Sequence, residues 1–185
     1  MSAPDPEKLA RVLAEEVAVV DYDPGWPGRF AREVERLRGF FPVGMIRRVE
    51  HFGSTAVPGL AAKPIVDILV AVDDLERVRA EVAPALEAAG YDFFWRPAFG
   101  DDGPRYPWFI ARDAEGRRTA HIHVVRPGDE HWGRLRFRDH LRAHPDVAAR
   151  YGALKRRLAA DLGHDRVAYT AAKAAFVAAN TPAPR

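Results

Sequence analysis

The sequence contains no cysteine among its 185 residues, which excludes disulfides, thiolate zinc sites and cysteine nucleophiles. Any chemistry must therefore come from His, Asp, Glu, Ser and Lys. The sequence also has no apolar run close to the roughly 20 residues that a membrane-spanning helix needs. Its first residues, MSAPDPEKLARVLAEE, are charged and lack the apolar segment of a secretory signal. We expect a cytoplasmic protein without a membrane partner.

The sequence has no large excess of charge of either sign. It contains 28 basic and 26 acidic residues, which give a net charge of +2. Lysine is scarce: 24 of the basic residues are arginine, and the four lysines are Lys8, Lys63, Lys155 and Lys173. An arginine and alanine bias is typical of a GC-rich genome, and the small excess is spread along the chain, unlike the concentrated basic face of nucleic-acid-binding proteins. Nucleic acid is therefore not an expected partner, and RNA binding ranks last among the functions considered.

Hydrophobic periodicity divides the chain into a sheet-forming part, up to about residue 126, and a helical part, residues 127–180. Strands are predicted over residues 45–52, 64–72, 91–95, 106–111 and 118–125, and helices over residues 5–16, 27–38, 73–89, 130–143, 145–162 and 166–179. Asp73 is expected to cap the third of these helices, and Pro84 to kink it. The pattern predicts one α/β or α+β domain over residues 17–180, preceded by a helix within residues 1–16 and followed by a disordered tail, residues 181–185.

A first group of polar residues begins where a predicted strand ends. Gly53, Ser54 and Thr55 follow that strand, where backbone amides and a hydroxyl can hold a phosphate, although a Gly-Ser pair is more often only a turn. Asp67 is the one charge in the next strand, PIVDILVAV. A charge in an apolar strand needs an ion-pair, hydrogen-bond or metal partner. Asp67 is therefore expected either to ligate a metal or to pair with Lys63 or an arginine.

His121 and His123 form a second group, because residues two apart on a strand project from the same face. Two imidazoles at this spacing can hold one transition metal, with a carboxylate as the third ligand. A hydrogen-bonded pair of histidines on a half-exposed strand explains the same pattern, and the residues alone favour neither alternative.

A third group lies on the predicted C-terminal helices. Arg138 and Arg142 are four residues apart, so they share one helix face and can clamp a phosphate or carboxylate. Asp139 with Arg142 is equally an ordinary surface ion pair. Tyr169 and Lys173 repeat the four-residue spacing on the last helix. Each of these pairs, taken alone, is more typical of a solvated helix face than of a site.

Several blocks of the sequence, in order, resemble the GrpB family. They are residues 22–27 (YDPGWP), 50–67 (EHFGSTAVPGLAAKPIVD), 121–125 (HIHVV), 137–145 (FRDHLRAHP), 151–155 (YGALK) and 169–173 (YTAAK). The resemblance covers about residues 17–180. This family belongs by fold to the nucleotidyltransferase superfamily, and relatives occur fused to dephospho-CoA kinase. The resemblance implies a nucleotidyltransferase-like mixed sheet of about five strands flanked by helices, with a helical C-terminal part.

The resemblance also implies a site. In the superfamily a Gly-Ser pair holds nucleotide phosphates, and a carboxylate-x-carboxylate pair with a third, later carboxylate binds two magnesium ions. Residues 53–54 match the Gly-Ser pair and Asp67 matches the first carboxylate, but Leu69 replaces the second, and His121 and His123 stand where an acid is expected. Magnesium prefers oxygen ligands in octahedral geometry, so the usual set cannot assemble. Asp67 with the two histidines would instead suit zinc, manganese or iron, or a metal-free site with a histidine as general base.

Two hypotheses of function follow from the resemblance. In the first, the protein is a nucleotidyltransferase-type transferase that acts on a nucleoside triphosphate and a small anionic substrate, with an atypical site for a divalent metal (Mg, Mn or Zn). The residues expected to bind phosphate or substrate are Gly53, Ser54, Thr55, Lys63, Arg138 and Lys173. Those expected at the metal and catalytic centre are Asp67, His121 and His123. In the second hypothesis, which Leu69 favours, the fold has lost transfer chemistry and binds a nucleotide or CoA-like ligand to assist a partner enzyme such as dephospho-CoA kinase.

Overall fold

The computed structural model describes residues 6–96 and 105–184. Its internal contacts divide it into two compact units. The helical unit takes the described parts of Met1–Pro24, Gly53–Pro64 and Gly133–Arg185, and the sheet unit takes the described parts of Gly25–Phe52 and Ile65–Trp132. Residues 1–5 of the predicted N-terminal helix and residue 185 of the predicted tail lie outside the described residues. A single domain over residues 17–180 stays a prediction.

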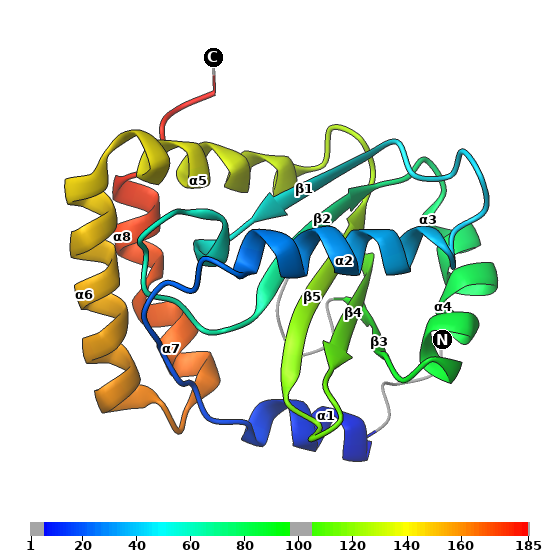
Figure 1. The fold of residues 1–185 in the computed structure, drawn as a ribbon, viewed down its shortest axis with the longest axis horizontal. Coiled ribbons are helices and arrows are strands. Elements are labelled where there is room, and N and C mark those ends of the chain that lie inside the picture. The colour runs from blue at the N-terminus through cyan, green and yellow to red at the C-terminus, as the bar shows by residue number, and fades with distance from the viewer. Residues whose placement is uncertain (1–5, 97–104, 185) are drawn as a thin grey trace. The chain divides into compact units, whose positions relative to one another are not determined.

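The sheet unit is built on a mixed sheet of five strands in the order β1-β2-β5-β4-β3 (Figure 1). The strands are β1 (Arg48–Phe52), β2 (Val66–Ala71), β3 (Asp92–Arg96), β4 (Tyr106–Arg112) and β5 (Arg118–Val125). β2 and β5 run parallel, and the other three neighbouring pairs are antiparallel. The predicted fold class, a mixed sheet of about five strands with helices and a helical C-terminal part, is confirmed.

The position of β2 inside the sheet explains its apolar sequence. It has β1 on one side and β5 on the other, and Leu69 and Val70 have no exposed surface. A strand covered on both faces needs such a continuous apolar run. Asp67 interrupts the run and lies opposite Phe52 in β1 and His121 in β5.

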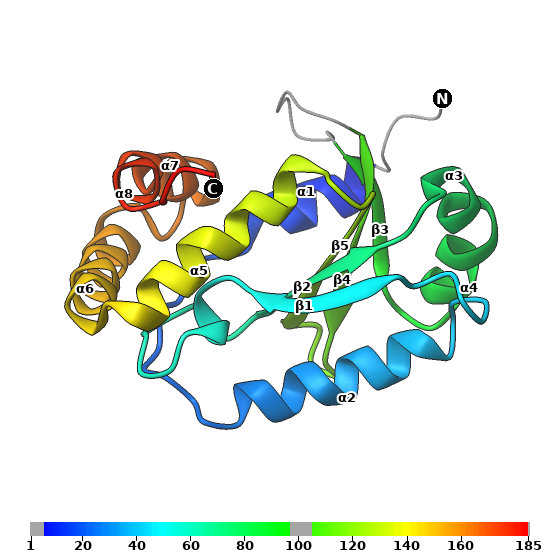
Figure 2. The same cartoon turned by 90° about the horizontal axis from the view of Figure 1, so that it is seen from above.

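Helix α2 (Trp26–Arg38) runs along one face of this sheet (Figure 2). It buries Trp26 and Leu37. Phe30 of α2 stacks on His51 of β1, with ring centroids 4.7 Å apart and ring planes 7° from parallel. His51 therefore identifies the face of β1 that α2 covers.

The connection from β2 to β3 is helical but irregular. It comprises α3 (Leu75–Arg77), a π-helical turn (Val78–Val82) and α4 (Ala83–Ala88). The Ala83 N–H bonds to the Val78 carbonyl five residues earlier, and Pro84 has no N–H to donate. The irregularity predicted at Pro84 is thus a π-turn just before the proline.

The cap predicted for this helix at Asp73 is wrong. The Asp74 carboxylate accepts a hydrogen bond from the Arg77 N–H at 3.0 Å and caps the helix. Asp73 instead forms an ion pair with Arg47, with 2.7 Å between Oδ2 and Nη2. Adjacent aspartates are equally suited to cap a helix, so the choice depends on where the helix starts.

The helical unit contains α1 (Pro6–Ala14), α5 (Arg134–Ala143), α6 (Pro145–Leu162), α7 (Arg166–Ala172) and α8 (Ala174–Ala179). α6 has the predicted bounds, whereas the helix predicted over residues 166–179 is interrupted at Lys173. Tyr151 of α6 packs in an apolar cluster with Val57 and Leu60, so the segment Gly53–Pro64 is held against the helices of its own unit. In the described residues, no helix has the length and apolar composition needed to cross a membrane.

Candidate functional site

The polar residues predicted within the sheet project from one of its faces. Asp67 pairs with His121, and Leu69 with His123, across the parallel strands β2 and β5. Because alternate residues of a strand share a face, Asp67, His121 and His123 project together. Phe52, the partner of Asp67 in β1, projects with them, whereas its neighbour in the chain stacks on α2. The Asp67 cluster therefore lies on the face opposite to α2.

Asp67 and His121 form a hydrogen-bonded pair. His121 Nδ1 is 3.2 Å from Asp67 Oδ1, and the His121 side chain is 11% exposed. The other ring nitrogen, Nε2, is 3.5 Å from Arg118 Nη1. A guanidinium can only donate, so Nε2 is the acceptor of this weak contact, and Nδ1 carries the proton donated to Asp67. These contacts favour the tautomer with its proton on Nδ1 and its lone pair on Nε2.

A β-bulge brings Arg118 to this face of the sheet. Thr119 and Ala120 of β5 lie opposite the single residue Ala111 of β4. Such a bulge reverses the alternation of side chains, so Arg118 lies on the same face as His121 although three positions separate them. Strand alternation alone would place Arg118 on the other face, which is why the sequence pattern did not select it.

His123 is enclosed by aromatic rings. Its Nδ1 is 3.2 Å from the hydroxyl of Tyr106 in β4, and the Tyr106 ring stacks on it with centroids 5.6 Å apart. The Phe52 ring packs edge-on against His123, with centroids 5.3 Å apart. The two histidines are therefore bonded to different strands: His123 to Tyr106 of β4, and His121 to Asp67 of β2.

His131 adds a third imidazole to the cluster. Its ring centroid is 4.5 Å from that of Tyr106, and its Nδ1 is 2.6 Å from Asp129 Oδ1. Both residues follow the turn after β5. No strand or helix period connects them to the other histidines, so the sequence contained no signal for this pair.

The residues of this face do not fit a two-magnesium site. Leu69 occupies the position of the second carboxylate and has no exposed surface, and magnesium needs more oxygen ligands than Asp67 supplies. In the part of the chain that the structure describes, no three His, Asp or Glu side chains gather in a way that could hold a metal ion. A zinc, manganese or iron ion bound by Asp67, His121 and His123 stays a prediction.

Gly53, Ser54 and Thr55 belong to the helical unit. Gly53 has a φ of 72°, a backbone conformation that side chains other than glycine rarely adopt. Ser54–Ala56 then form one 3₁₀ turn. Thr55 is buried and Ser54 is half-buried, so Ser54 is the more accessible of the two hydroxyls.

Two cations of the helical unit fix this loop. Arg142 Nε donates to the Ala56 carbonyl at 2.8 Å, and Lys155 Nζ donates to the Ala61 carbonyl. Lys155 is 2% exposed. A buried ammonium needs such an acceptor, so both contacts hold the loop that begins at Gly53 in place. Arg142 Nη1 is also 3.8 Å from Asp139 Oδ1, the surface ion pair that was the alternative to a phosphate clamp, and the clamp itself stays a prediction.

The remaining predicted phosphate ligands also have contacts within the helical unit. Arg138 Nε is 2.7 Å from Asp139 Oδ1. The Nζ atoms of Lys63 and Lys173 lie 5.7 and 4.4 Å from the ring centroid of Tyr169. Burial raises the pKa of Tyr169 to about 12, so its ring stays neutral. Both ammonium groups lie near the same ring, and phosphate binding by Lys63 and Lys173 stays a prediction.

Comparison with known proteins identifies relatives along almost the whole chain. The family model described as GrpB protein matches residues 16–182. A UPF0157 protein of Pseudomonas aeruginosa is 38% identical over 183 residues, which cover 96% of this chain and 74% of that protein. The crystal structure of the conserved protein GrpB from Enterococcus faecalis is similar with a TM-score of 0.75 and 34% identity, over 89% of this chain and 94% of that one. A dephospho-CoA kinase of Mycolicibacterium paratuberculosis is 34% identical over 85% of this chain but 43% of its own length.

Proposed function

This chain belongs to the GrpB family, and from that premise we propose that it is a nucleotidyltransferase-type transferase in which His121 is the general base. The reaction moves the nucleotidyl group of a nucleoside triphosphate to an oxygen of a small anionic acceptor, and pyrophosphate leaves. The observation that carries the proposal is the 3.2 Å contact between Asp67 Oδ1 and His121 Nδ1.

Asp67 orients the imidazole and fixes its tautomer. With Nδ1 bonded to the carboxylate, Nε2 takes the proton of an acceptor hydroxyl as its oxygen attacks the α-phosphorus. Asp67 then stabilises the imidazolium that forms, as a carboxylate does beside a histidine base. The buried Arg118 guanidinium is next to Nε2, where it can pair with phosphate oxygens once the substrates occupy the site.

Phosphate and substrate binding are proposed for residues that the family resemblance selects. They are Gly53, Ser54, Thr55, Lys63, Arg138 and Lys173. The proposal is supported by the position of Lys63 and Lys173, whose ammonium groups both lie near the Tyr169 ring, because an ammonium group attracts phosphate oxygens. A divalent metal remains a proposed cofactor, and none of the proton transfers described above passes through it.

The test is a transfer assay with each labelled nucleoside triphosphate, a panel of small hydroxy acids as hydroxyl acceptors, and Mg²⁺, Mn²⁺ or Zn²⁺. Loss of the base in His121→Gln should lower turnover by about 10²-fold or more. His164→Gln is the matched control, because His164 is exposed in the connection between α6 and α7. Full turnover by a folded His121→Gln variant would contradict the proposal.

Two observations favour a second function, that of a ligand-binding module assisting a partner enzyme. The dephospho-CoA kinase relative matches this chain over less than half of its own length, so a kinase and a region of this type occur in one protein. In addition, position 69 is leucine in this chain, whereas enzymes of the superfamily have a metal-binding carboxylate at the corresponding position. Under this alternative, dephospho-CoA or CoA raises the melting temperature, and no nucleotide is turned over with any of the three metals.

A further inference from the structure

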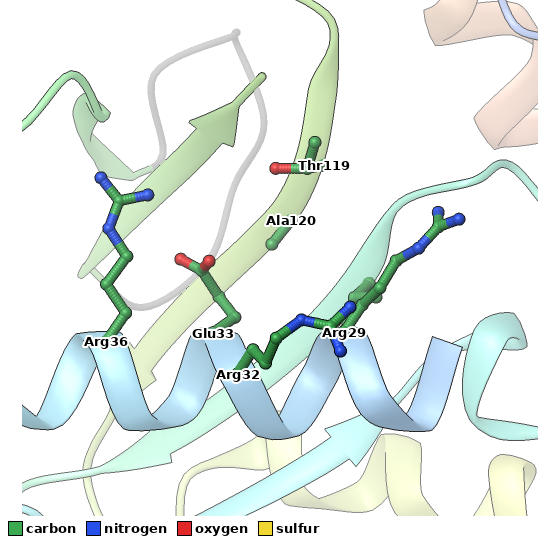
Figure 3. Close-up of a pocket in the computed structure, with 7 residues that line it drawn as sticks. Arg29, Arg32, Glu33, Arg36, Thr119 and Ala120 are labelled. Carbon is green, nitrogen blue, oxygen red and sulfur yellow. The ribbon is translucent and has the colours of Figure 1, made fainter. Parts of the chain in front are cut away.

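The sheet unit has a polar pocket beside α2. A pocket of about 310 Å³ is lined by Arg29, Arg32, Glu33 and Arg36 of α2 and by Val66 and Thr119 of the sheet (Figure 3). Val66 directly precedes Asp67 in β2, and alternation therefore turns it to the opposite face. The pocket is thus separated from the Asp67–His121 pair by the sheet.

The pocket carries a positive charge of two, because three guanidiniums outnumber one carboxylate. Arg29, Arg32 and Arg36 follow one helix face at spacings of three and four residues, where like charges repel. All three side chains are exposed, so a ligand can reach them from solvent. In Figure 3 they extend from α2 on both sides of Glu33. An anion in the pocket would relieve this repulsion.

Two of the pocket residues are held by Tyr91. The Tyr91 hydroxyl donates to Glu33 Oε1 at 2.5 Å, and the Arg36 guanidinium lies over the Tyr91 ring at 4.8 Å from its centroid. Arg36 Nη2 also donates to the Ala89 carbonyl at 3.2 Å. Burial, together with Glu33, raises the pKa of Tyr91, so the hydroxyl keeps its proton and the arrangement persists at neutral pH.

The β-bulge supplies the pocket with a hydroxyl. Thr119 is the additional residue of β5 at the bulge and is half-buried in the pocket wall. In Figure 3 it lies on the strand across the pocket from α2. One bulge therefore places Arg118 on the His121 face and Thr119 beside the arginines.

We propose that this pocket binds a short polyphosphate chain, such as pyrophosphate or the phosphates of a nucleoside di- or triphosphate. The rise of an α-helix puts Arg29 and Arg36 on the order of 10 Å apart along α2, which suits a chain of phosphates better than a single carboxylate. Guanidiniums bind phosphate oxygens in pairs, and Thr119 can donate a further hydrogen bond. The volume is at the lower end for small-molecule pockets, so the phosphates rather than a whole cofactor fill it.

Titration calorimetry of the full chain with pyrophosphate tests the proposal. We expect wild-type protein to bind, and the Arg29→Ala/Arg32→Ala variant to bind about tenfold more weakly or worse. Arg38→Ala is the matched control, because Arg38 is exposed on the same helix and does not line the pocket; its affinity should stay within about twofold. Melting temperatures confirm that each variant is folded. No binding by the wild type at millimolar pyrophosphate, or equal affinity in the double variant, overturns the proposal.

Glu33→Gln provides a test in the opposite direction. The amide oxygen still accepts from Tyr91, but a negative charge leaves the pocket, so pyrophosphate should bind several-fold more tightly. Weaker binding would contradict an anion in this pocket. Citrate is the comparison ligand: equal affinity and equal sensitivity to the double variant would overturn a polyphosphate site. The Arg29→Ala/Arg32→Ala variant should keep the wild-type turnover in the transfer assay, because the sheet separates this pocket from His121; a loss of pyrophosphate binding with unchanged turnover therefore reports on the pocket and not on the transfer site.

Discussion

The two faces of the sheet unit differ in how they accommodate charge. On one face, Asp67 and His121 are hydrogen-bonded partners within the sheet, and His123 lies among aromatic rings. On the other face, beside α2, Arg29 and Arg32 are exposed around an open pocket. Buried polar groups must be satisfied inside the fold, whereas exposed side chains can also bind a ligand from solvent. Substitutions on the first face should therefore affect stability, and those on the second should affect binding.

The largest effect is expected where a new charge is introduced into the first face. Leu69→Asp restores the carboxylate-x-carboxylate spacing, but Leu69 has no exposed surface. An uncompensated carboxylate there should lower the free energy of unfolding by about 4 kcal/mol. Urea denaturation measures the loss, and Leu69→Met, which conserves volume, is the control and should cost less than about 1.5 kcal/mol.

The Leu69→Asp variant also tests whether this face of the sheet can bind magnesium. If Asp67 and a new carboxylate at position 69 could hold magnesium, Mg²⁺ would restore the lost stability in proportion to its concentration. We expect no restoration, because the neighbouring histidines do not provide the oxygen ligands that magnesium needs. A rise in the melting temperature of Leu69→Asp with Mg²⁺ would show instead that Asp67 and a carboxylate at position 69 can hold magnesium on this face.

A smaller loss is expected when Asp67 is removed. Asp67→Ala leaves the Nδ1–H of the buried His121 without this acceptor, which should cost about 2 kcal/mol. Asp67→Asn keeps an oxygen in place and should cost less. Nitrogen chemical shifts of the imidazole report the tautomer directly, and we expect Nδ1–H in the wild type. An Nε2–H tautomer in the wild type would contradict the assigned hydrogen bonds.

Tyr106→Phe tests the aromatic part of the same face. The substitution keeps the ring that stacks on His123 and removes the hydroxyl 3.2 Å from its Nδ1. The expected loss is about 1 kcal/mol, the usual contribution of one hydrogen bond. Tyr22→Phe is the control, because the Tyr22 hydroxyl lies outside this cluster. Its removal should lower the free energy of unfolding by less than Tyr106→Phe does.

Much of the fold could be predicted from the sequence, because the spacing of hydrophobic residues along a strand or helix follows which of its side chains are buried. The strand Arg118–Val125 and the helix Pro145–Leu162 have their predicted bounds. The errors occur where one residue decides between equivalent local structures: Asp74 replaces Asp73 as the cap, and the last helix is interrupted at Lys173. Local propensity does not separate such alternatives, since tertiary contacts decide them.

The site was readable only in part. Asp67 was conspicuous as a charge in an apolar strand, and the register confirms that it projects with His121 and His123. Arg118 was not, because a bulge changes the face of a side chain without leaving a pattern in the sequence. The arginine row of α2 was equally invisible as a site, since on an isolated helix it is the ordinary polar face of an amphipathic pattern.

The smallest change in stability is expected at that arginine row. Arg29→Ala/Arg32→Ala removes two exposed charges from a helix face on which they repel each other and Arg36. Surface substitutions of this kind change the free energy of unfolding by less than about 0.5 kcal/mol, and relief of repulsion can make the sign favourable. Urea denaturation without ligand measures this change in the free energy of unfolding. Added pyrophosphate should then stabilise the wild type more than the variant. A large loss of stability in the absence of ligand would show instead that Arg29 and Arg32 hold α2 on the sheet, and the contrast between a structural face and a binding face would fail.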